Sequence, residues 1–426
     1  MIGIAALLAA MVACAPVPAA QATGEVIAEI TVHGNVLTTD DEVRRLAGLQ
    51  VGMPLTPQTV DEATARLRAA KKFDHVEIRK RFASISDPDK IVLVVIVDEG
   101  PVHLERTGDP VHPARVVKNR GPNLLFLPIL ESEDSYGFSY GARVAMPDAM
   151  GKESRISFPL TWGGDRQAAI ELDKRLERTH LVRFTGGGGF SQRTNPFFDE
   201  HDTRERMWGR AERELLKGLR LGATSSVEHV RFGGPSEHDD ISDNLGRVSA
   251  DVIVDTRLDP MLAHNAVYGR AAWEHVHFSS GSPSLNRVEL DGRGYIGLFG
   301  QNVLIVRAYK ADADGPLPPY LKMLFGGIGT VRGFASGYKL ADTIAAGSLE
   351  VLVPLTSPLN IARLGVSGFV DAGAAYDKGQ RFADQPLVRG FGGSVWVTAA
   401  FLRFSIAVAH GVGGSTRLHA GGTVSF

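Results

Sequence analysis

The stretch that decides the fold is residues 287–296, Arg-Val-Glu-Leu-Asp-Gly-Arg-Gly-Tyr-Ile. Charged side chains occupy the odd positions up to residue 293, and apolar residues or glycines occupy the even ones. Successive side chains of a β-strand point to opposite faces, so this pattern indicates a strand with one ionic and one apolar face. The same period of two recurs at residues 138–146 and 402–408. The pattern therefore predicts an antiparallel sheet with two chemically different faces.

Segments of this kind follow one another from residue 123 to residue 426, separated by turns rich in Gly, Pro, Asp and Asn. We count roughly sixteen, each long enough for the ~9–11 residues of a tilted strand that crosses a membrane. A large soluble β-sandwich or propeller also alternates, but its polar face is exposed to water. Here charges recur on one face while the other is almost free of them, which favours a barrel with an ionic lumen. The expected fold is mainly β, with a 16-stranded transmembrane antiparallel β-barrel at residues 123–426.

Residues 24–100 follow a different pattern. A strand is expected at Val26 to His33, then two segments with apolar residues at helical spacing, then strands at Phe73 to Phe82 and Lys90 to Val97. This order predicts one small β-α-α-β-β domain. Residues 101–122 contain four prolines and several charges, and we expect them to form a linker.

The first residues resemble a targeting segment. An apolar stretch is followed by Ala20-Gln21-Ala22, the small-x-small pattern that a signal peptidase accepts, so we expect a signal peptide at residues 1–22 and export from the cytoplasm. Cys14 is the only cysteine, which excludes a disulfide framework and leaves lipidation of Cys14 as an alternative. The formal net charge of -2, with no basic arm, gives no reason to expect nucleic acid as a partner.

A long connection at residues 312–345 interrupts the series of strands. It contains the run Thr330-Val331-Arg332-Gly333-Phe334, and a loop this long and rich in glycine is usually functional or disordered. Glu350 and Asp371 are isolated carboxylates in the two apolar strands that follow. A buried guanidinium needs carboxylate partners, because leaving it unpaired is costly. Arg332 and the two carboxylates could therefore satisfy one another across a lumen.

These residues resemble the BamA/TamA family of outer-membrane assembly factors, the bacterial surface antigens. Residues 331–334 look like the family signature in the sixth extracellular loop, and residues 350 and 369–373 match the strand motifs that follow it. The resemblance implies that Val331, Arg332, Gly333 and Phe334 fold back into the barrel and that Arg332 contacts Glu350 and Asp371, which would lock the loop in the lumen. The domain at residues 24–100 resembles a periplasmic POTRA domain.

The last eight residues form a second motif. They read polar-x-Gly-x-x-apolar-x-aromatic, at His419, Gly421, Val424 and Phe426. This motif is similar to the signal by which barrel proteins are themselves inserted, which implies the barrel assembly machinery as a partner. The alternative is simply a final strand.

Other patterns could be mistaken for active sites. Residues 137–141 fit the G-x-S-x-G formula of esterases but lie within a strand with no helix after it. Residues 186–189 are all glycine but lack the Lys-Ser/Thr of a phosphate loop. His238-Asp239-Asp240 is interpreted as a solvated loop rather than a metal site. We expect no catalytic residue, no metal and no cofactor, and hence no enzyme.

The resemblance implies a factor for outer-membrane protein insertion, assembly or polypeptide translocation. The domain in the periplasm would capture unfolded or extended client polypeptides and pass them to a barrel surrounded by outer-membrane lipids. One POTRA domain, where assembly factors of the family carry several, argues against the role of the essential central insertase. The alternative is a passive outer-membrane channel or structural barrel that retains the architecture.

Overall fold

The computed structural model describes residues 25–35, 37–73, 75–83, 89–99, 102–106, 114–118, 124–134, 136–176, 183–233, 240–257, 263–356, 362–399 and 402–424. The chain divides into two compact units, residues 1–120 and residues 121–426. The expected signal peptide at residues 1–22, with Cys14, lies outside the described residues. None of the helices in the described ranges is long and apolar enough to cross a membrane.

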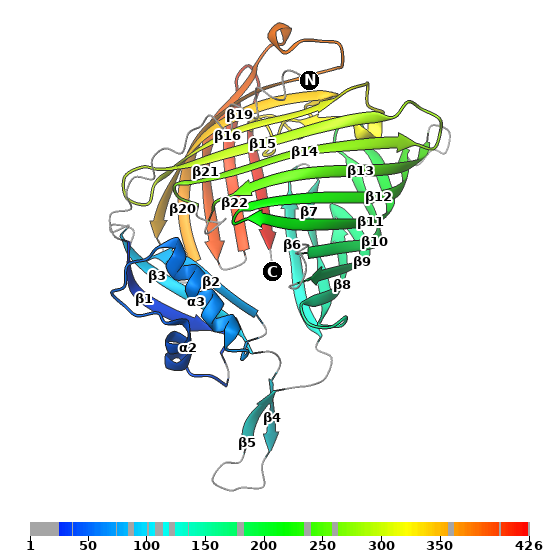
Figure 1. Ribbon diagram of the computed structural model, residues 1–426. Coiled ribbons are helices and arrows are strands. Elements are labelled where there is room, and N and C mark those ends of the chain that lie inside the picture. Colours follow the sequence, from blue (N-terminus) through cyan, green and yellow to red (C-terminus); the bar gives the residue numbers. More distant parts are fainter. Residues whose placement is uncertain are drawn as a thin grey trace. The chain divides into compact units, whose positions relative to one another are not determined.

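The first unit contains a three-stranded sheet and two helices (Figure 1). Its elements are β1 (Val26–His33), α2 (Asp40–Ala47), α3 (Pro57–Ala69), β2 (His75–Phe82) and β3 (Lys90–Asp98). The strand order is β1-β3-β2, with β3 parallel to β1 and antiparallel to β2. Alternate residues of the central strand from Ile91 to Val97 are buried in one core with both helices. The predicted β-α-α-β-β domain is confirmed.

Threonines begin both helices of this unit. Thr39 accepts a hydrogen bond from the backbone N–H of Glu42, and Thr56 accepts one from Thr59. Pro57 occupies the first turn of α3, where a missing N–H costs nothing. The caps satisfy backbone donors that have no partner within the helix, so the sequence fixes where each helix starts.

Residues 101–122, which the sequence predicts to be a linker, contain a hairpin. Strands β4 (Val102–Arg106) and β5 (Ala114–Lys118) pair antiparallel along their whole length. Neither strand contains any of the four prolines of this region. Every residue of the two strands can therefore donate its backbone N–H to the ladder.

The second unit is a closed barrel of sixteen strands (Figure 1). Its strands are β6 (Leu125–Glu133), β7 (Gly137–Pro147), β8 (Ser154–Gly163), β9 (Asp165–Arg175), β10 (Arg183–Asn195), β11 (Glu200–Leu216), β12 (Leu219–Gly233), β13 (Ile241–Asp255), β14 (Ala266–Phe278), β15 (Leu285–Gly297), β16 (Val303–Ala313), β19 (Thr343–Thr356), β20 (Ala362–Tyr376), β21 (Val388–Ala399), β22 (Leu402–Gly411) and β23 (Thr416–Val424). Each strand pairs antiparallel with its neighbours. The predicted 16-stranded antiparallel barrel is confirmed.

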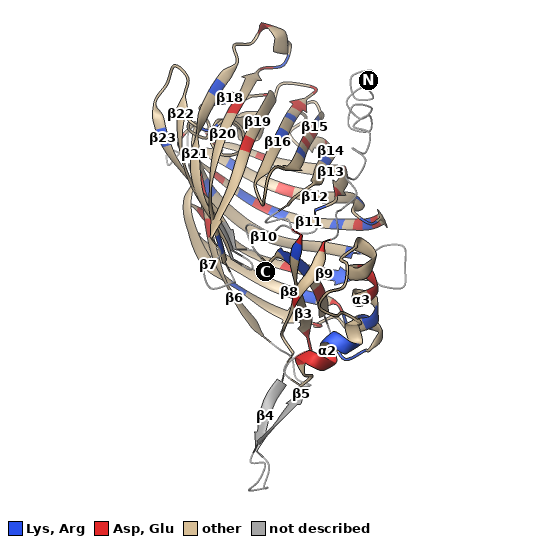
Figure 2. Ribbon diagram, turned by 90° about the vertical axis from the view of Figure 1, so that its left-hand side faces the viewer, with Lys and Arg blue, Asp and Glu red and all other residues tan. Residues whose placement is uncertain are grey.

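The two faces of the wall differ as the alternating pattern predicts. Phe138 and Tyr140 are more than half exposed on the outer face, whereas Ser139 between them is buried. On the inner face Asp291 pairs with both Arg293 and Arg307, one of several ion pairs between and within strands. Figure 2 marks the charged residues along these strands. An apolar outside and an ionic inside are the arrangement of a barrel in a lipid bilayer.

The connection between β16 and β19 is folded. It spans residues 314–342, slightly less than the predicted 312–345, because both strands continue further than their apolar runs. It contains a short helix η1 (Pro319–Leu321) and a pair of short strands, β17 (Met323–Phe325) and β18 (Lys339–Ala341). Apolar residues of the connection share a core with residues of β12, β13 and β14 on the inner wall. We call the end of the barrel that holds this core the loop end.

Candidate functional site

The run Val331 to Phe334, here called the loop tip, lies at the end of a closed turn. The backbone N–H of Gly327 donates to the carbonyl of Phe334 at 2.9 Å. The Thr330 hydroxyl accepts from the N–H of Gly326 at 2.7 Å and lies 3.0 Å from the carbonyl of the same residue. Val331 is completely buried and Phe334 almost so. Two apolar anchors and a closed backbone thus hold the tip in one conformation.

Arg332 projects from the tip to two neighbouring strands. Its Nε and Nη2 donate to the two carboxylate oxygens of Asp371 on β20, at 2.8 and 2.9 Å. Its Nη1 donates to Glu350 on β19 at 2.8 Å. The backbone N–H of Arg332 also donates to Asp371, at 3.0 Å. A bidentate pair with a second carboxylate uses every nitrogen of the guanidinium, which is the strong geometry for such a contact.

Further side chains complete the surroundings of the guanidinium. The Ser348 hydroxyl accepts from Nη2 at 3.1 Å, and the ring of Phe369 lies under the guanidinium carbon, 3.3 Å from it. Ser367 donates to the second oxygen of Glu350 at 2.5 Å. Asp371 is 4 % exposed, so its charge is stable only because Arg332 and the backbone N–H compensate it. The site holds a charged loop residue against the wall.

Small residues on two more strands let the tip approach the wall. A Cβ atom at Gly390 on β21 would lie 1.9 Å from the carbonyl oxygen of Arg332. Gly333 has φ +96°, and a Cβ there would lie 2.6 Å from the backbone of Gly411 on β22. Only glycine fits at these positions, because the loop and the wall meet backbone to backbone.

The tip also contacts the last strand. The backbone N–H of Gly333 donates to Nε2 of His419 on β23 at 2.9 Å, and Nδ1 of that ring lies 2.7 Å from Asp134, directly after β6. His419 is 1 % exposed. Asp134 accepts a second hydrogen bond, from the N–H of Ile328, at 3.2 Å. The loop therefore reaches both the first and the last strand of the barrel.

Ion pairs hold the base of the connection at the loop end. Asp342 accepts hydrogen bonds from the backbone N–H groups of Leu317 and Lys378, at 2.8 and 3.0 Å, and pairs with Lys322 at 2.9 Å. Burial alone would raise the pKa of Asp342, but these hydrogen bonds and the lysine ammonium outweigh it and hold the pKa below its usual range. On the opposite wall the Tyr320 hydroxyl donates to Asp243 at 2.8 Å.

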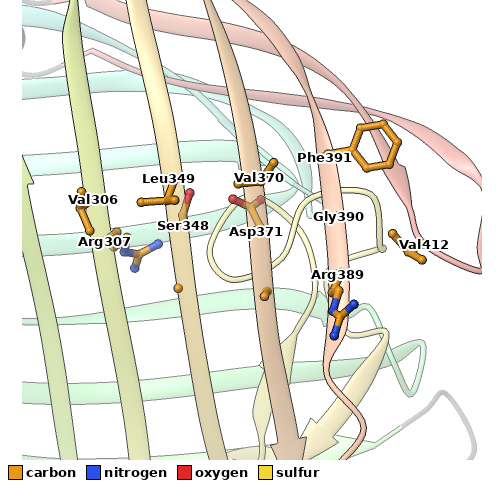
Figure 3. A pocket seen from close by; sticks show the side chains of 12 residues that line it. Val306, Arg307, Ser348, Leu349, Val370, Asp371, Arg389, Gly390, Phe391 and Val412 are labelled. Atoms are coloured by element: carbon orange, nitrogen blue, oxygen red, sulfur yellow. The ribbon is translucent and has the colours of Figure 1, made fainter. Parts of the chain in front are cut away.

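The outer face of strands β19, β20 and β21 carries a hollow of about 510 Å³ (Figure 3). Leu349, Val370 and Phe391 line it and point away from the loop, while Ser348 and Asp371 belong to the inner face. Its lining is mainly apolar, as expected of a wall in contact with lipid. Among the described residues we find no cluster of three or more side chains that could hold a metal ion.

The structure brings together the residues that the sequence singled out around the tip. Arg332, Glu350 and Asp371 lie in direct contact. Of the C-terminal motif, His419 and Gly421 face the loop, the side chain of Val424 is not described, and Phe426 lies outside the described residues. The role of this motif as an assembly signal stays a prediction.

Sequence reasoning missed several partners of the tip. Phe369 and Ser348 each lie two positions from a predicted carboxylate, so the period of two was sufficient to place them on the same inner face. Gly390 and Asp134 carry no such local signal. Their contacts depend on the register between strands that are distant in sequence.

Comparison with known proteins gives the same architecture. The family model of the Omp85 superfamily domain matches residues 134–415, and the POTRA model, a surface antigen variable number repeat, matches residues 25–100. No curated protein sequence matches the chain significantly.

Solved structures are similar in fold. BamA from Haemophilus ducreyi lacking POTRA domains 1-3 has a TM-score of 0.60 at 15% identity, over 94% of this chain and 84% of that one. CdiB from Escherichia coli has a TM-score of 0.53 at 11% identity, over 96% and 92% of the two chains. CdiB from Acinetobacter baumannii has a TM-score of 0.51 at 11% identity, over 95% and 74%. Because the Omp85 model matches residues 134–415, more than half of this chain, the chain belongs to the Omp85 superfamily, as a BamA/TamA-like outer-membrane barrel with a POTRA domain.

Proposed function

We propose that this protein inserts other proteins into the outer membrane or translocates polypeptides across it, and that clients pass through the boundary between its first and last strands. We call this boundary between β6 and β23 the seam. Membership of the Omp85 superfamily supports the general activity. The construction of the seam supports the route.

The observation that carries the route is the pairing of the seam. The described parts of β23 and β6 share one residue pair, Gly422 with Ser132. By contrast, β22 and β23 pair from Leu402 with Val424 through to His410 with Thr416. A strand edge without a partner can bind an extended segment of another chain through main-chain hydrogen bonds. Since Thr423 and Val424, the described residues of β23 that follow Gly422, pair with no residue of β6, we propose that a client strand adds to the edge of β6 before Ser132.

The POTRA domain offers a second edge for an extended client. The sheet order β1-β3-β2 places β2 at one side, and no strand of the described residues pairs with its outer edge. We propose that the domain captures the client there by strand addition, and that the periplasm is its location.

The rival function, a passive channel, is less well supported. The connection 314–342 places a hydrophobic core inside the loop end of the barrel, with Phe325 and Val331 completely buried. A packed core leaves less room for water and ions than an empty lumen does. High ion conductance of the purified protein in planar bilayers, together with an unchanged outer-membrane proteome after depletion, would favour the channel.

A disulfide across the seam tests the proposed route. Ser132→Cys with Gly422→Cys places two thiols at the pair that the described parts of the two strands share, where antiparallel partners are close enough to form a disulfide. Under oxidising conditions we expect the barrel to stay folded and the variant to fail to support the outer-membrane proteome in cells depleted of the wild type. Reduction should restore activity.

The matched control places the disulfide where no opening is proposed. Leu349→Cys with Val370→Cys joins a register pair of β19 and β20 on the outer face. This disulfide should leave activity unchanged. Full activity of the oxidised seam variant would exclude passage through the seam.

A further inference from the structure

We infer that His419 is a positioning residue through which the loop tip holds the seam closed. The inference rests on the proposed role of the seam, because it concerns what keeps that boundary shut between clients. The contact on which it depends joins residues far apart in the sequence, since Asp134 and His419 are separated by 285 positions.

The hydrogen bonds fix the state of the His419 ring. The N–H of Gly333 can only donate, so Nε2 of His419 must accept and carries no proton. The proton then lies on Nδ1, which donates to the carboxylate of Asp134 at 2.7 Å. The ring is neutral, is buried and has both nitrogens occupied. It bridges the loop tip and the residue that follows the first strand.

These contacts lie beyond the one backbone pair that the described residues of β6 and β23 form. β6 ends at Glu133, one residue beyond its pair with β23. Towards the loop end, closure depends on the side chains of Asp134 and His419. The loop reinforces both sides, because Ile328 donates its N–H to Asp134 and its side chain packs beside Gly421, where a Cβ would lie 3.0 Å away.

The tip that supports the seam is itself held by strands β19 and β20. Gly333 follows Arg332, whose guanidinium is held by Asp371 and Glu350 on β20 and β19. The wall therefore holds the tip, and the tip holds β23 through the Gly333–His419 hydrogen bond. Withdrawal of the tip would leave Nε2 of a buried ring without a donor and so favour separation of the strands.

The test measures seam closure without any client. The rate of disulfide formation between Ser132→Cys and Gly422→Cys reports how often the two strands are paired in the folded barrel. Arg332→Ala removes the contacts of the tip with Asp371 and Glu350 but changes neither seam strand. It should lower this rate, because loss of the Gly333–His419 hydrogen bond reduces the equilibrium constant for seam pairing about fivefold. Protease cleavage within residues 326–334 shows independently that the tip has been released.

Two substitutions of His419 separate its two hydrogen bonds. The amide nitrogen of His419→Asn can replace Nδ1 as donor to Asp134 but offers no acceptor to Gly333. The amide oxygen of His419→Gln can replace Nε2 as acceptor from Gly333. We expect Arg332→Ala to have no further effect on the seam in His419→Asn, and to retain its effect in His419→Gln.

A matched control uses a histidine elsewhere in the wall. His275 on β14 has Nδ1 within 3.0 Å of Asn286 on β15, and His275→Asn should leave the seam rate unchanged. Heat-modifiable migration on gels verifies that each variant is folded.

The inference is overturned if Arg332→Ala exposes the tip to protease while the seam rate stays at the wild-type value. It is equally overturned if Arg332→Ala lowers the rate of disulfide formation in His419→Asn as much as in the wild type. Slower disulfide formation at the seam in His275→Asn would also overturn it. Each of these results leaves the proposed function intact, because that function is tested by the activity of the oxidised seam variant.

Discussion

The β19–β20 boundary and the seam face the same loop tip but are built in opposite ways. β19 and β20 share thirteen residue pairs, and on their inner face Arg332 joins a carboxylate from each strand. The described residues of the seam strands form one backbone pair, and beyond it the seam has the hydrogen bonds of His419 to Gly333 and Asp134. The difference indicates which part of the barrel is a fixed support and which part can open.

The charge of the groups at each boundary explains why the two boundaries differ in strength. A buried arginine between two carboxylates cannot leave without exposing uncompensated charges, whereas a neutral histidine can exchange its partners for water or a client. The loop tip is therefore bound firmly to β19 and β20 and makes only weaker contacts with the seam. The following predictions test this contrast, from the largest effect to the smallest.

Replacement of Arg332 should have the largest effect. Arg332→Ala leaves the buried Asp371 without its ionic partner, and removal of one member of a buried ion pair costs about 3–5 kcal/mol. We expect the free energy of unfolding to fall by that order and the loop to become sensitive to protease. Arg381→Ala is the matched control, because the exposed Arg381–Asp384 pair is worth at most about 1 kcal/mol. Equal stability of both variants would show that the ion cluster does not anchor the tip.

A smaller change at the wall should separate contact from charge. Gly390→Ala puts a Cβ atom 1.9 Å from the Arg332 carbonyl, and overpacking of this kind costs about 1–3 kcal/mol. The tip should move away from β21 and gain protease sensitivity, although every charge is retained. Gly368→Ala on β20 is the control, because a Cβ there meets nothing within 4 Å. If both alanine variants behave alike, close approach at Gly390 is not required.

Acid should weaken the base of the loop by a smaller amount. The pKa of Asp342 is lowered in the folded state, so its contribution to stability is present above its ordinary pKa of about 3.9 and is lost as the pH falls through the folded value. Asp342→Asn cannot titrate. The difference in Tm between wild type and this variant should therefore be constant near neutral pH and shrink below about pH 4. A difference that stays constant into acid would refute a contribution from the carboxylate.

The sequence by itself determined the barrel and the ion cluster. In a bilayer every backbone group must be paired within the protein, so sixteen amphipathic segments leave a closed barrel as the solution. Arg332, Glu350 and Asp371 were recognisable because isolated charges in apolar segments need one another. The threonine at position 39 likewise marked the start of the first helix of the POTRA domain.

Only the tertiary structure decided how the barrel closes. The register of β6 against β23 depends on the tilt and stagger of all sixteen strands, which no local pattern encodes. That register pairs Ser132 with Gly422, shortens the seam and brings Asp134 to His419. The approach of the tip to Gly390 likewise follows from the spacing of the closed wall. Local periodicity specifies which face a residue occupies, whereas the partner it meets there depends on the closure of the whole sheet.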